Sequence, residues 1–280
     1  MQYNLSIIIS HYHIDNQINP LYKTLDSITK QINTEHVEII VADDGSKYSN
    51  DIVKNYSNKI EIKNDVRNFY NLEGESLAAF LKTQNIENKF ITKWIYLPKL
   101  IPCMSKARII NQSVKLAQSN QLLFLDDDNY LVSNNSIQNL LNLFENYQFI
   151  VGQVQNKNGY LRSYNSNRVQ GTTIGIKKEI FNAVNGFGEW TEKYSCGVDS
   201  DFWIKTFNYF KHNNSLKACY SNQLRTCDSY SKRWKKYTRF LKELRLKYKF
   251  YQLYNCKNYK SKKYNHSRNK ILWMDNLVNE

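Results

Sequence analysis

Three consecutive carboxylates, Asp126, Asp127 and Asp128, directly follow the apolar residues 122–125. Four apolar residues in a row predict a buried strand, so the acids lie where that strand leaves the sheet, the edge at which open α/β folds bind ligands. Like charges this close repel one another unless a cation lies among them. A divalent metal that also holds a phosphorylated substrate meets this need, because hard cations bind carboxylate and phosphate oxygens together. A solvated acidic turn is the alternative.

Two further strands are predicted before this one, at residues 5–10 and 37–42, because both runs are apolar and rich in β-branched side chains. Residues 21–32 between them carry apolar side chains at spacings of 4, 3 and 4, which predicts an amphipathic helix. The second strand ends in Asp43, Asp44 and a glycine turn. This alternation predicts a right-handed crossover in a nucleotide-type sheet.

The rest of the chain up to about residue 228 continues the alternation of strands and helices. Residues 60–97 contain strand-like pieces whose order the sequence does not define. Residues 105–117 predict a helix that leads directly into the strand before the aspartates. A helix at 136–144, a strand at 149–154, and a strand, short helix and loop within 171–188 follow.

The basic charge of the chain is concentrated at its carboxyl-terminal end. Residues 229–280 hold 15 lysines and arginines against 3 acids, which accounts for +12 of the formal net charge of +14. We therefore expect two units, a domain at 1–228 and a basic, aromatic-rich helical extension at 229–280. Scattered cysteines and the lack of a signal-type amino terminus predict a reducing, cytoplasmic location. No apolar run reaches the roughly 20 residues that span a bilayer, so membrane contact would be peripheral.

A basic amphipathic helix is predicted at residues 232–254. Its aromatic and leucine side chains recur every three or four residues, at Trp234, Tyr237, Leu241, Leu244, Tyr248 and Tyr251. Such a stripe flanked by cations suits an anionic membrane surface, which would place the chain at the inner face of the membrane. Docking of the stripe on the domain is the alternative, and contact with an acidic glycan or nucleic acid is a third.

Four motifs in order resemble the family 2 glycosyltransferases of the GT-A fold, over most of residues 3–210. They are residues 41–46, residues 105–111 followed by Ala117, residues 125–129, and residues 185–189 followed by 197–201. The last is most similar to the galactosyltransferase-like segment of chondroitin-synthase-type enzymes. The resemblance implies a Rossmann-like nucleotide-binding mixed sheet flanked by helices. It also implies metal-dependent, inverting transfer of a hexose or N-acetylhexosamine from a UDP-sugar to a glycan or lipid-linked acceptor, in surface polysaccharide synthesis.

The resemblance and the chemistry together assign the donor site. Asp44 is expected to accept the uracil N–H, and Asp126 to face the ribose or the sugar. Mn²⁺ or Mg²⁺ on Asp128 would neutralise the leaving diphosphate as a Lewis acid. The residues expected to line the donor site are Ser10, His11, Asp44, Arg108, Asp126 and Asp127.

The acceptor hydroxyl must lose a proton as it attacks the anomeric carbon, so a carboxylate is needed on the face opposite the diphosphate. Asp199 is the candidate base, and attack from that face inverts the anomeric configuration. Asp201 could orient the acceptor. Trp190 or Trp203 could offer a flat face to a sugar ring, with ordinary core packing as the alternative.

Two positions depart from the family pattern. Val198 stands where relatives usually carry Glu, just before the base. A third metal ligand in such enzymes is often a histidine, whereas this chain has Cys227 and Asp228 in the corresponding stretch. Asp228 is the better ligand for Mg²⁺ or Mn²⁺ because its oxygens are hard.

Three alternatives to the transferase hypothesis stay open. A sugar-phosphate nucleotidyltransferase would also need a nucleotide-binding sheet, but residues 11–15 contain no glycine-rich basic loop for a triphosphate. A nucleic-acid-binding protein would leave the acidic clusters unexplained, because they repel phosphate. A non-catalytic, glycan-binding relative would explain Val198.

Overall fold

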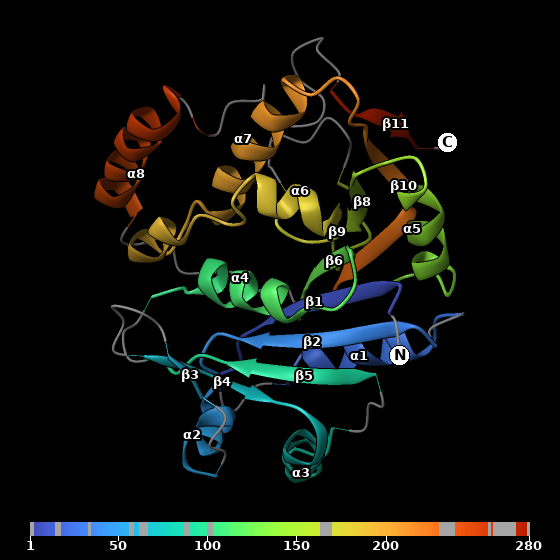
Figure 1. Cartoon of the computed structure of the whole chain (residues 1–280), viewed down its shortest axis with the longest axis vertical. Helices are drawn as coiled ribbons and strands as arrows, with labels where there is room; N and C mark the ends of the chain where they lie inside the picture. The colour runs from blue at the N-terminus through green and yellow to red at the C-terminus, as the bar shows by residue number, and fades with distance from the viewer. Residues whose placement is uncertain are drawn as a thin grey trace.

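The computed structural model describes residues 3–14, 18–32, 35–55, 59–61, 67–86, 90–99, 103–162, 170–229, 239–256, 259 and 273–278, without the side chains of 239–242. A mixed sheet runs through the molecule, with helices on both faces (Figure 1). This is the expected α/β architecture.

The centre of the sheet is parallel, and most of its residues are buried. Its strands, in spatial order, are β5 (Ile91–Tyr96), β2 (Val37–Asp43), β1 (Leu5–His11) and β6 (Gln121–Asp126). Continuous apolar runs form these strands because both faces of the sheet are covered by helices. Beyond β5 the sheet continues through two antiparallel edge strands, β4 (Asn68–Leu72) and β3 (Lys59–Glu61).

The other half of the sheet mixes strand directions. It contains β9 (Ile174–Lys177), β8 (Phe149–Gln155), β10 (Ala218–Asp228) and β11 (Asp275–Leu277). β9 lies antiparallel between β6 and β8, and β10 runs parallel to β8. A short strand, β7 (Asn129–Leu131), turns back from the end of β6 and pairs with β10. The end of β6 is thereby tied to the end of β10.

Two apolar layers cover the sheet. One face carries α1 (Leu21–Thr29), α2 (Asp51–Asn55), α3 (Gly74–Thr83) and α5 (Ser136–Phe144), and the 3₁₀ helix η1 (Lys47–Asn50) precedes α2. The opposite face carries α4 (Lys106–Leu116), α6 (Lys178–Ala183) and α7 (Val198–Lys211), and the 3₁₀ helix η2 (Glu189–Tyr194) lies between the last two in sequence. Each long helix buries one stripe at helical spacing, as Leu21, Leu25 and Ile28 do in α1.

The basic carboxyl-terminal helix α8 (Arg239–Tyr254) lies beside α7 (Figure 1). It docks through Leu246 and Phe250, which pack with Ile204 of α7 in a third apolar cluster. Leu244 and Tyr248, two members of the predicted stripe, face solvent instead. The stripe members Trp234, Tyr237 and Leu241 lie outside the described side chains. The division at residue 228 remains a prediction, and both α8 and β11 contact the part of the chain before it.

Most predicted elements are confirmed within one to three residues, including α4, α5, β8 and the β9–α6 pair. Helix α3 was not predicted; it lies in the segment 60–97, whose order was undefined. The composition of residues 255–270, rich in Lys, Asn and Tyr, predicts an extended segment, and most of it lies outside the described residues. Among the helices that the structure describes, none has the length and apolar character needed to cross a bilayer.

Candidate functional site

Strand register brings the predicted donor residues to one edge of the sheet. Ser10 of β1 lies opposite Asp126 of β6, and His11 lies opposite Asp43 of β2. The carboxyl ends of the parallel strands lie at this edge, and β2 and β6 flank β1 on opposite sides. This is the switch point at which doubly wound sheets bind nucleotides.

Asp126 is held by two donors. Its Oδ1 accepts hydrogen bonds from Ser10 Oγ at 2.7 Å and from Lys106 Nζ at 2.5 Å. Lys106, the first residue of α4, also donates to the Gly171 carbonyl at 3.3 Å. A cation from α4 therefore already lies among the acids that the sequence singled out.

Asp199, the candidate base, lies in the first turn of α7 and packs against Gly171. A Cβ atom at position 171 would lie only 2.3 Å from Asp199 Oδ1, so glycine is required for this approach. Gly171 contacts Lys106 through its carbonyl and Asp199 through its Cα face. Asp126 and Asp199 thus belong to one cluster although 73 residues separate them in the sequence.

Asp127 points to His11 rather than to Lys106. Its Oδ2 lies 2.6 Å from His11 Nδ1, and His11 Nε2 lies 2.6 Å from the Tyr48 hydroxyl. Burial lowers the pKa of His11, but the hydrogen bond and charge of Asp127, with the charge of Asp43, outweigh it and raise the pKa. His11 is buried and supports Asp127; its expected contact with the donor remains a prediction.

Asp128 and Asp228, the predicted metal ligands, come from adjacent strand ends. Asn129 of β7 pairs with Asp228 of β10, and the Ser229 amide donates to the Asp128 carbonyl at 2.7 Å. Asp228 Oδ1 accepts from Asn129 Nδ2 at 2.6 Å, and its Oδ2 lies 3.4 Å from the Arg162 guanidinium.

These residues fit a hard divalent cation. The predicted ligand atoms of Asp128 and Asp228 are all oxygens. The neighbouring Asn129 Oδ1 is buried and has no hydrogen-bond partner among the described residues. The described residues contain no cluster of three His, Cys, Asp or Glu side chains suited to a metal. Mg²⁺ commonly takes only one or two carboxylates and completes its shell with water and substrate phosphate.

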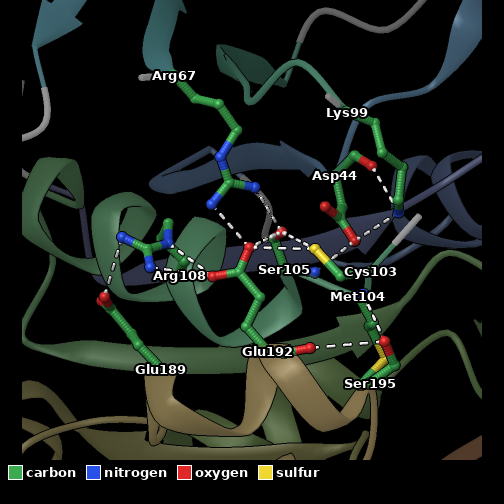
Figure 2. Close-up of polar contacts among 10 residues, drawn as sticks. All are labelled: Asp44, Arg67, Lys99, Cys103, Met104, Ser105, Arg108, Glu189, Glu192 and Ser195. Atoms are coloured by element: carbon green, nitrogen blue, oxygen red, sulfur yellow. Dashed lines mark hydrogen bonds and ion pairs between the residues drawn. The ribbon is translucent and has the colours of Figure 1, made fainter. Parts of the chain in front are cut away.

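Asp43 and Asp44 have different surroundings. Asp43 is fully buried and closes its own turn, accepting from the Ser46 amide, Ser49 Oγ and Trp94 Nε1. Asp44 Oδ2 accepts from the Ser105 amide at 2.9 Å and from Lys99 Nζ at 3.1 Å (Figure 2). Burial raises the pKa of Asp44 to about 6, against the opposing effect of Lys99.

Glu192 of η2 is the centre of a buried ionic cluster (Figure 2). It lies 2.7 Å from the Arg67 guanidinium and 3.0 Å from that of Arg108, and it accepts from Ser105 Oγ at 2.5 Å. Burial raises the pKa of Glu192, but the hydrogen bonds from Ser105 and Arg67 and the two positive charges outweigh it and lower the pKa. Arg108 also lies 3.5 Å from Glu189. Its guanidinium is thus engaged by η2, and its expected role at the diphosphate remains a prediction.

Sequence reasoning missed Arg67, Lys99 and Glu192. Each is a single charged residue in an irregular segment or a short 3₁₀ turn, outside the four motifs. No spacing or composition signal distinguishes it from a solvated surface charge.

Asp201 and Trp190, the predicted acceptor residues, contact each other and α8. Asp201 is fully buried, and its carboxylate accepts from Trp190 Nε1 at 2.9 Å and from the Tyr254 hydroxyl, and pairs with Lys205 Nζ at 2.8 Å. The rings of Trp190 and Phe250 meet edge to face, with their centroids 5.1 Å apart. Their contact with an acceptor remains a prediction.

Val198 and Trp203 are core residues. Val198 packs in the apolar layer beneath α7, so the position usually occupied by Glu faces the core in this chain. Trp203 is fully buried and donates to the Gln170 carbonyl at 2.6 Å, which agrees with the core-packing alternative.

The family model described as Glycosyl transferase family 2 matches residues 6–85, which contain β1, β2 and Asp44. No curated protein sequence gives a match. The mannosyltransferase PcManGT from Pyrobaculum calidifontis, solved with GDP-Man and Mn²⁺, is similar in structure, with a TM-score of 0.51 at 11% identity. The similar region covers 83% of this chain and 59% of that one.

TarS 1–349 from S. aureus, solved with UDP-GlcNAc, gives a TM-score of 0.55 at 13% identity, covering 85% of this chain and 61% of that chain. This chain therefore spans less than two thirds of either structure. The family match ends before residues 185–201, so the likeness of that segment to chondroitin-synthase-type enzymes remains a prediction. Residues 6–85 thus match glycosyl transferase family 2 in sequence, and the architecture of the chain is that of the GT-A fold.

Proposed function

We propose that this chain is a metal-dependent, inverting glycosyltransferase that moves a hexose or N-acetylhexosamine from a UDP-sugar to a glycan or lipid-linked acceptor. The observation that carries the proposal is the cluster in which Lys106 and Gly171 connect Asp126 to Asp199. Two structurally similar proteins were solved with nucleotide sugars, one of them also with Mn²⁺, which supports the donor class and the metal. Assembly of a surface polysaccharide is the setting we propose.

The donor is held at the sheet edge. Asp128 and Asp228 would hold Mn²⁺ or Mg²⁺, and the bound ion would supply the positive charge that a leaving diphosphate needs. Asp126 orients the ribose or the sugar, because Ser10 and Lys106 fix its carboxylate. Preorganised groups of this kind do not have to reorient during the reaction.

The acceptor is activated from the other side of the cluster. Asp199 accepts the proton of the attacking hydroxyl as the new glycosidic bond forms and the bond to the diphosphate breaks. With Asp199 on the face of the sugar opposite the diphosphate, as we propose, attack would give a product of inverted configuration. Gly171, whose carbonyl accepts from Lys106, leaves room for the Asp199 carboxylate against its Cα.

The test is UDP release from a panel of UDP-sugars with Mn²⁺ or Mg²⁺ present. We expect Asp199→Asn to lower turnover by about 10²- to 10⁴-fold, the usual contribution of a general base, while UDP still binds. Asp128→Ala should remove metal-dependent turnover. Asp26→Asn is the matched control, because Asp26 lies exposed on α1 and pairs only with Lys30 among the described residues. Unchanged turnover in the first two variants would contradict the proposal.

The same assay separates the alternative reaction. A sugar-phosphate nucleotidyltransferase would consume a nucleoside triphosphate and a sugar phosphate and release pyrophosphate. Release of pyrophosphate from that pair, with no UDP released from UDP-sugars, would favour the alternative.

A peripheral contact with an anionic membrane through residues 232–254 is part of the proposal. Leu244, Tyr248 and Tyr251 form an exposed stripe on α8, flanked by the exposed cations Arg245 and Lys247. Each basic residue near anionic headgroups contributes about 1 kcal/mol of binding free energy. The five free thiols support a reducing, cytoplasmic compartment.

Sedimentation with lipid vesicles tests the membrane contact. The chain should bind vesicles that contain phosphatidylglycerol and not vesicles of phosphatidylcholine alone. The double variant Leu244→Ser, Tyr248→Ser should lose the binding without loss of UDP release. Equal sedimentation of the variant and the native chain would count against this surface.

A further inference from the structure

Helix α8, which lies beside α7, contacts the first turn of α7 at two points (Figure 1). Gly197, the residue before α7, has φ of +92°, and a Cβ atom there would lie 3.2 Å from Leu246 Cδ2 of α8. Four residues later, Asp201 accepts a hydrogen bond from the hydroxyl of Tyr254, the last residue of α8. The candidate base Asp199 lies between these two contacts. α8 is therefore placed to fix the turn that carries the base.

The Asp201 carboxylate connects three elements. It is fully buried, and its Oδ1 accepts from Trp190 Nε1 of η2 at 2.9 Å as well as from Tyr254. Its Oδ2 lies 2.8 Å from Lys205 Nζ, one turn further along α7. A Cβ atom at Gly188 would lie 2.5 Å from this Oδ2, so glycine leaves the room that the carboxylate needs. Asp201 thus joins η2, α7 and α8 through charge-assisted hydrogen bonds, which are the stronger kind.

The Tyr254 hydroxyl is held in place by the packing of α8. Phe250, one turn earlier, is fully buried between the rings of Trp190 and Tyr259, with centroids at 5.1 and 4.4 Å. Burial, followed by the charge and hydrogen bond of Asp201, raises the pKa of Tyr254, so the hydroxyl keeps its proton and donates. The contact between α8 and Asp201 therefore has a defined direction and geometry.

The other side of the same turn fits closely against the donor site. Asp199 packs on Gly171, where a Cβ atom would lie only 2.3 Å from its Oδ1. The Gly171 carbonyl accepts from Lys106, which also donates to Asp126. A catalytic group displaced by about 1 Å can lose about 10²-fold in rate. The placement of the first turn of α7 thus bears directly on the proposed reaction.

We propose that Tyr254 and Asp201 are positioning residues for the base Asp199, and that α8 is for this reason part of the catalytic unit. The inference rests on the proposed function and adds the groups that orient its base. Tyr254 acts through Asp201, whose amide donates to the Gly197 carbonyl at 2.9 Å and so closes the turn around Asp199. Neither side chain has to touch the donor or the acceptor to act in this way.

Hydrolysis of a UDP-sugar by the full chain, without an acceptor, tests the inference. Water attacks the anomeric carbon, the bond to the diphosphate breaks, and Asp199 takes a proton of the water. Tyr254→Phe removes only the hydroxyl, and Trp190 and Lys205 still hold Asp201. We expect kcat to fall about tenfold with an unchanged KM, because the misplaced group acts in the transition state. Tyr248→Phe, at an exposed position of α8, is the matched control and should change neither.

Asp201→Asn is the second variant, and it retains the size of the side chain while removing the charge. It should lower kcat by at least as much as Tyr254→Phe does. The double variant should lose no more than Asp201→Asn alone, because the hydroxyl acts through that carboxylate. Thermal melting verifies that each variant is folded at the temperature of the assay.

The possible results separate positioning from other roles of the pair. A lower melting temperature of Tyr254→Phe with unchanged kcat would mean that the contact only stabilises the fold, and would overturn the inference. A raised KM with unchanged kcat would place the pair at the sugar donor, and losses that multiply in the double variant would make the two residues independent; either result would also overturn it. Failure of the native chain to release UDP from any UDP-sugar would overturn the proposed function together with it.

Discussion

Asp44 gives the donor site a predicted pH dependence. Burial raises its pKa to about 6, while Lys99 and the Ser105 amide favour the charged form. The ionised carboxylate accepts the base N–H more strongly than the neutral acid does, because a charged acceptor makes the stronger hydrogen bond. We therefore expect UDP affinity to fall as the pH drops through 6 and to be constant above it.

Calorimetric titration of UDP between pH 5 and pH 8 measures this profile. Asp44→Asn is the control, because its amide oxygen still accepts a hydrogen bond but does not titrate in this range. The native profile should bend and that of the variant should be flat. If UDP affinity depended on pH in the same way for the native chain and the variant, a group other than Asp44 would cause the dependence.

Gly171 is predicted to be essential for catalysis through its size. Gly171→Ala places a methyl group 2.3 Å from Asp199 Oδ1, so the carboxylate has to move. We expect turnover to fall by about 10²-fold, the usual result of misplacing a catalytic group by about 1 Å. UDP affinity should be unchanged because Asp44 lies outside this contact. A matching loss of UDP binding would show that the variant disturbs the whole site.

At the scale of elements, α8 is predicted to be held by one face only. Phe250 is fully buried against Trp190 and α7, whereas Tyr248 is 63% exposed. Phe250→Ala should lower the free energy of unfolding by about 3 kcal/mol or more. Tyr248→Ala should change it by no more than about 0.5 kcal/mol.

Urea denaturation followed by circular dichroism compares the two variants. Equal effects would mean that α8 does not dock through Phe250. The comparison matters for function because Tyr254, at the end of α8, donates to Asp201, which lies two residues after the candidate base in α7. Loosening of α8 would therefore reach the helix that carries Asp199.

At the scale of the whole molecule, His11 connects three distant segments. It joins β1 to Asp127 after β6 and to Tyr48 of η1. The pKa of His11 is raised, because the interactions with Asp127 and Asp43 outweigh burial. A raised pKa means that the folded state binds the proton more tightly than the unfolded state, so the stabilisation is complete below the ordinary histidine range.

We therefore expect the contribution of His11 to stability to decline as the pH rises through its raised pKa. The measurement is the difference in the free energy of unfolding between the native chain and His11→Asn, at pH 6 and at pH 9. The difference should be larger at pH 6. His36→Asn, at an exposed position, is the control for the substitution itself. A larger difference at pH 9 would mean that His11 is stabilised in its neutral form.

Local sequence patterns were enough to predict the elements that bury one continuous apolar run or one apolar stripe. β1, β2 and β6 are continuous apolar runs, and α4 and α5 carry apolar residues at helical spacing, so each segment contains its own signal. The acids at the strand ends followed, since a strand that stops at a polar turn places that turn at the sheet edge. The fold class and the place of Asp126 at the sheet edge were predictable for this reason, whereas Asp199, in the first turn of α7, was a candidate only through the family resemblance and the need for a base.

Other features depended on which surfaces meet in three dimensions. Periodicity marked Leu244, Tyr248 and Tyr251 on α8, which are exposed, whereas the residues that dock are Leu246 and Phe250, outside the predicted stripe. Asp44, Ser105 and Glu192 are separated by 61 and 87 residues, and contacts between loops leave no period in either segment. A buried charge and a solvated charge look alike in a sequence, because burial is a property of the partner surface. Only the tertiary structure could therefore show that Lys99 pairs with Asp44, and that Glu192 holds the serine whose amide donates to Asp44.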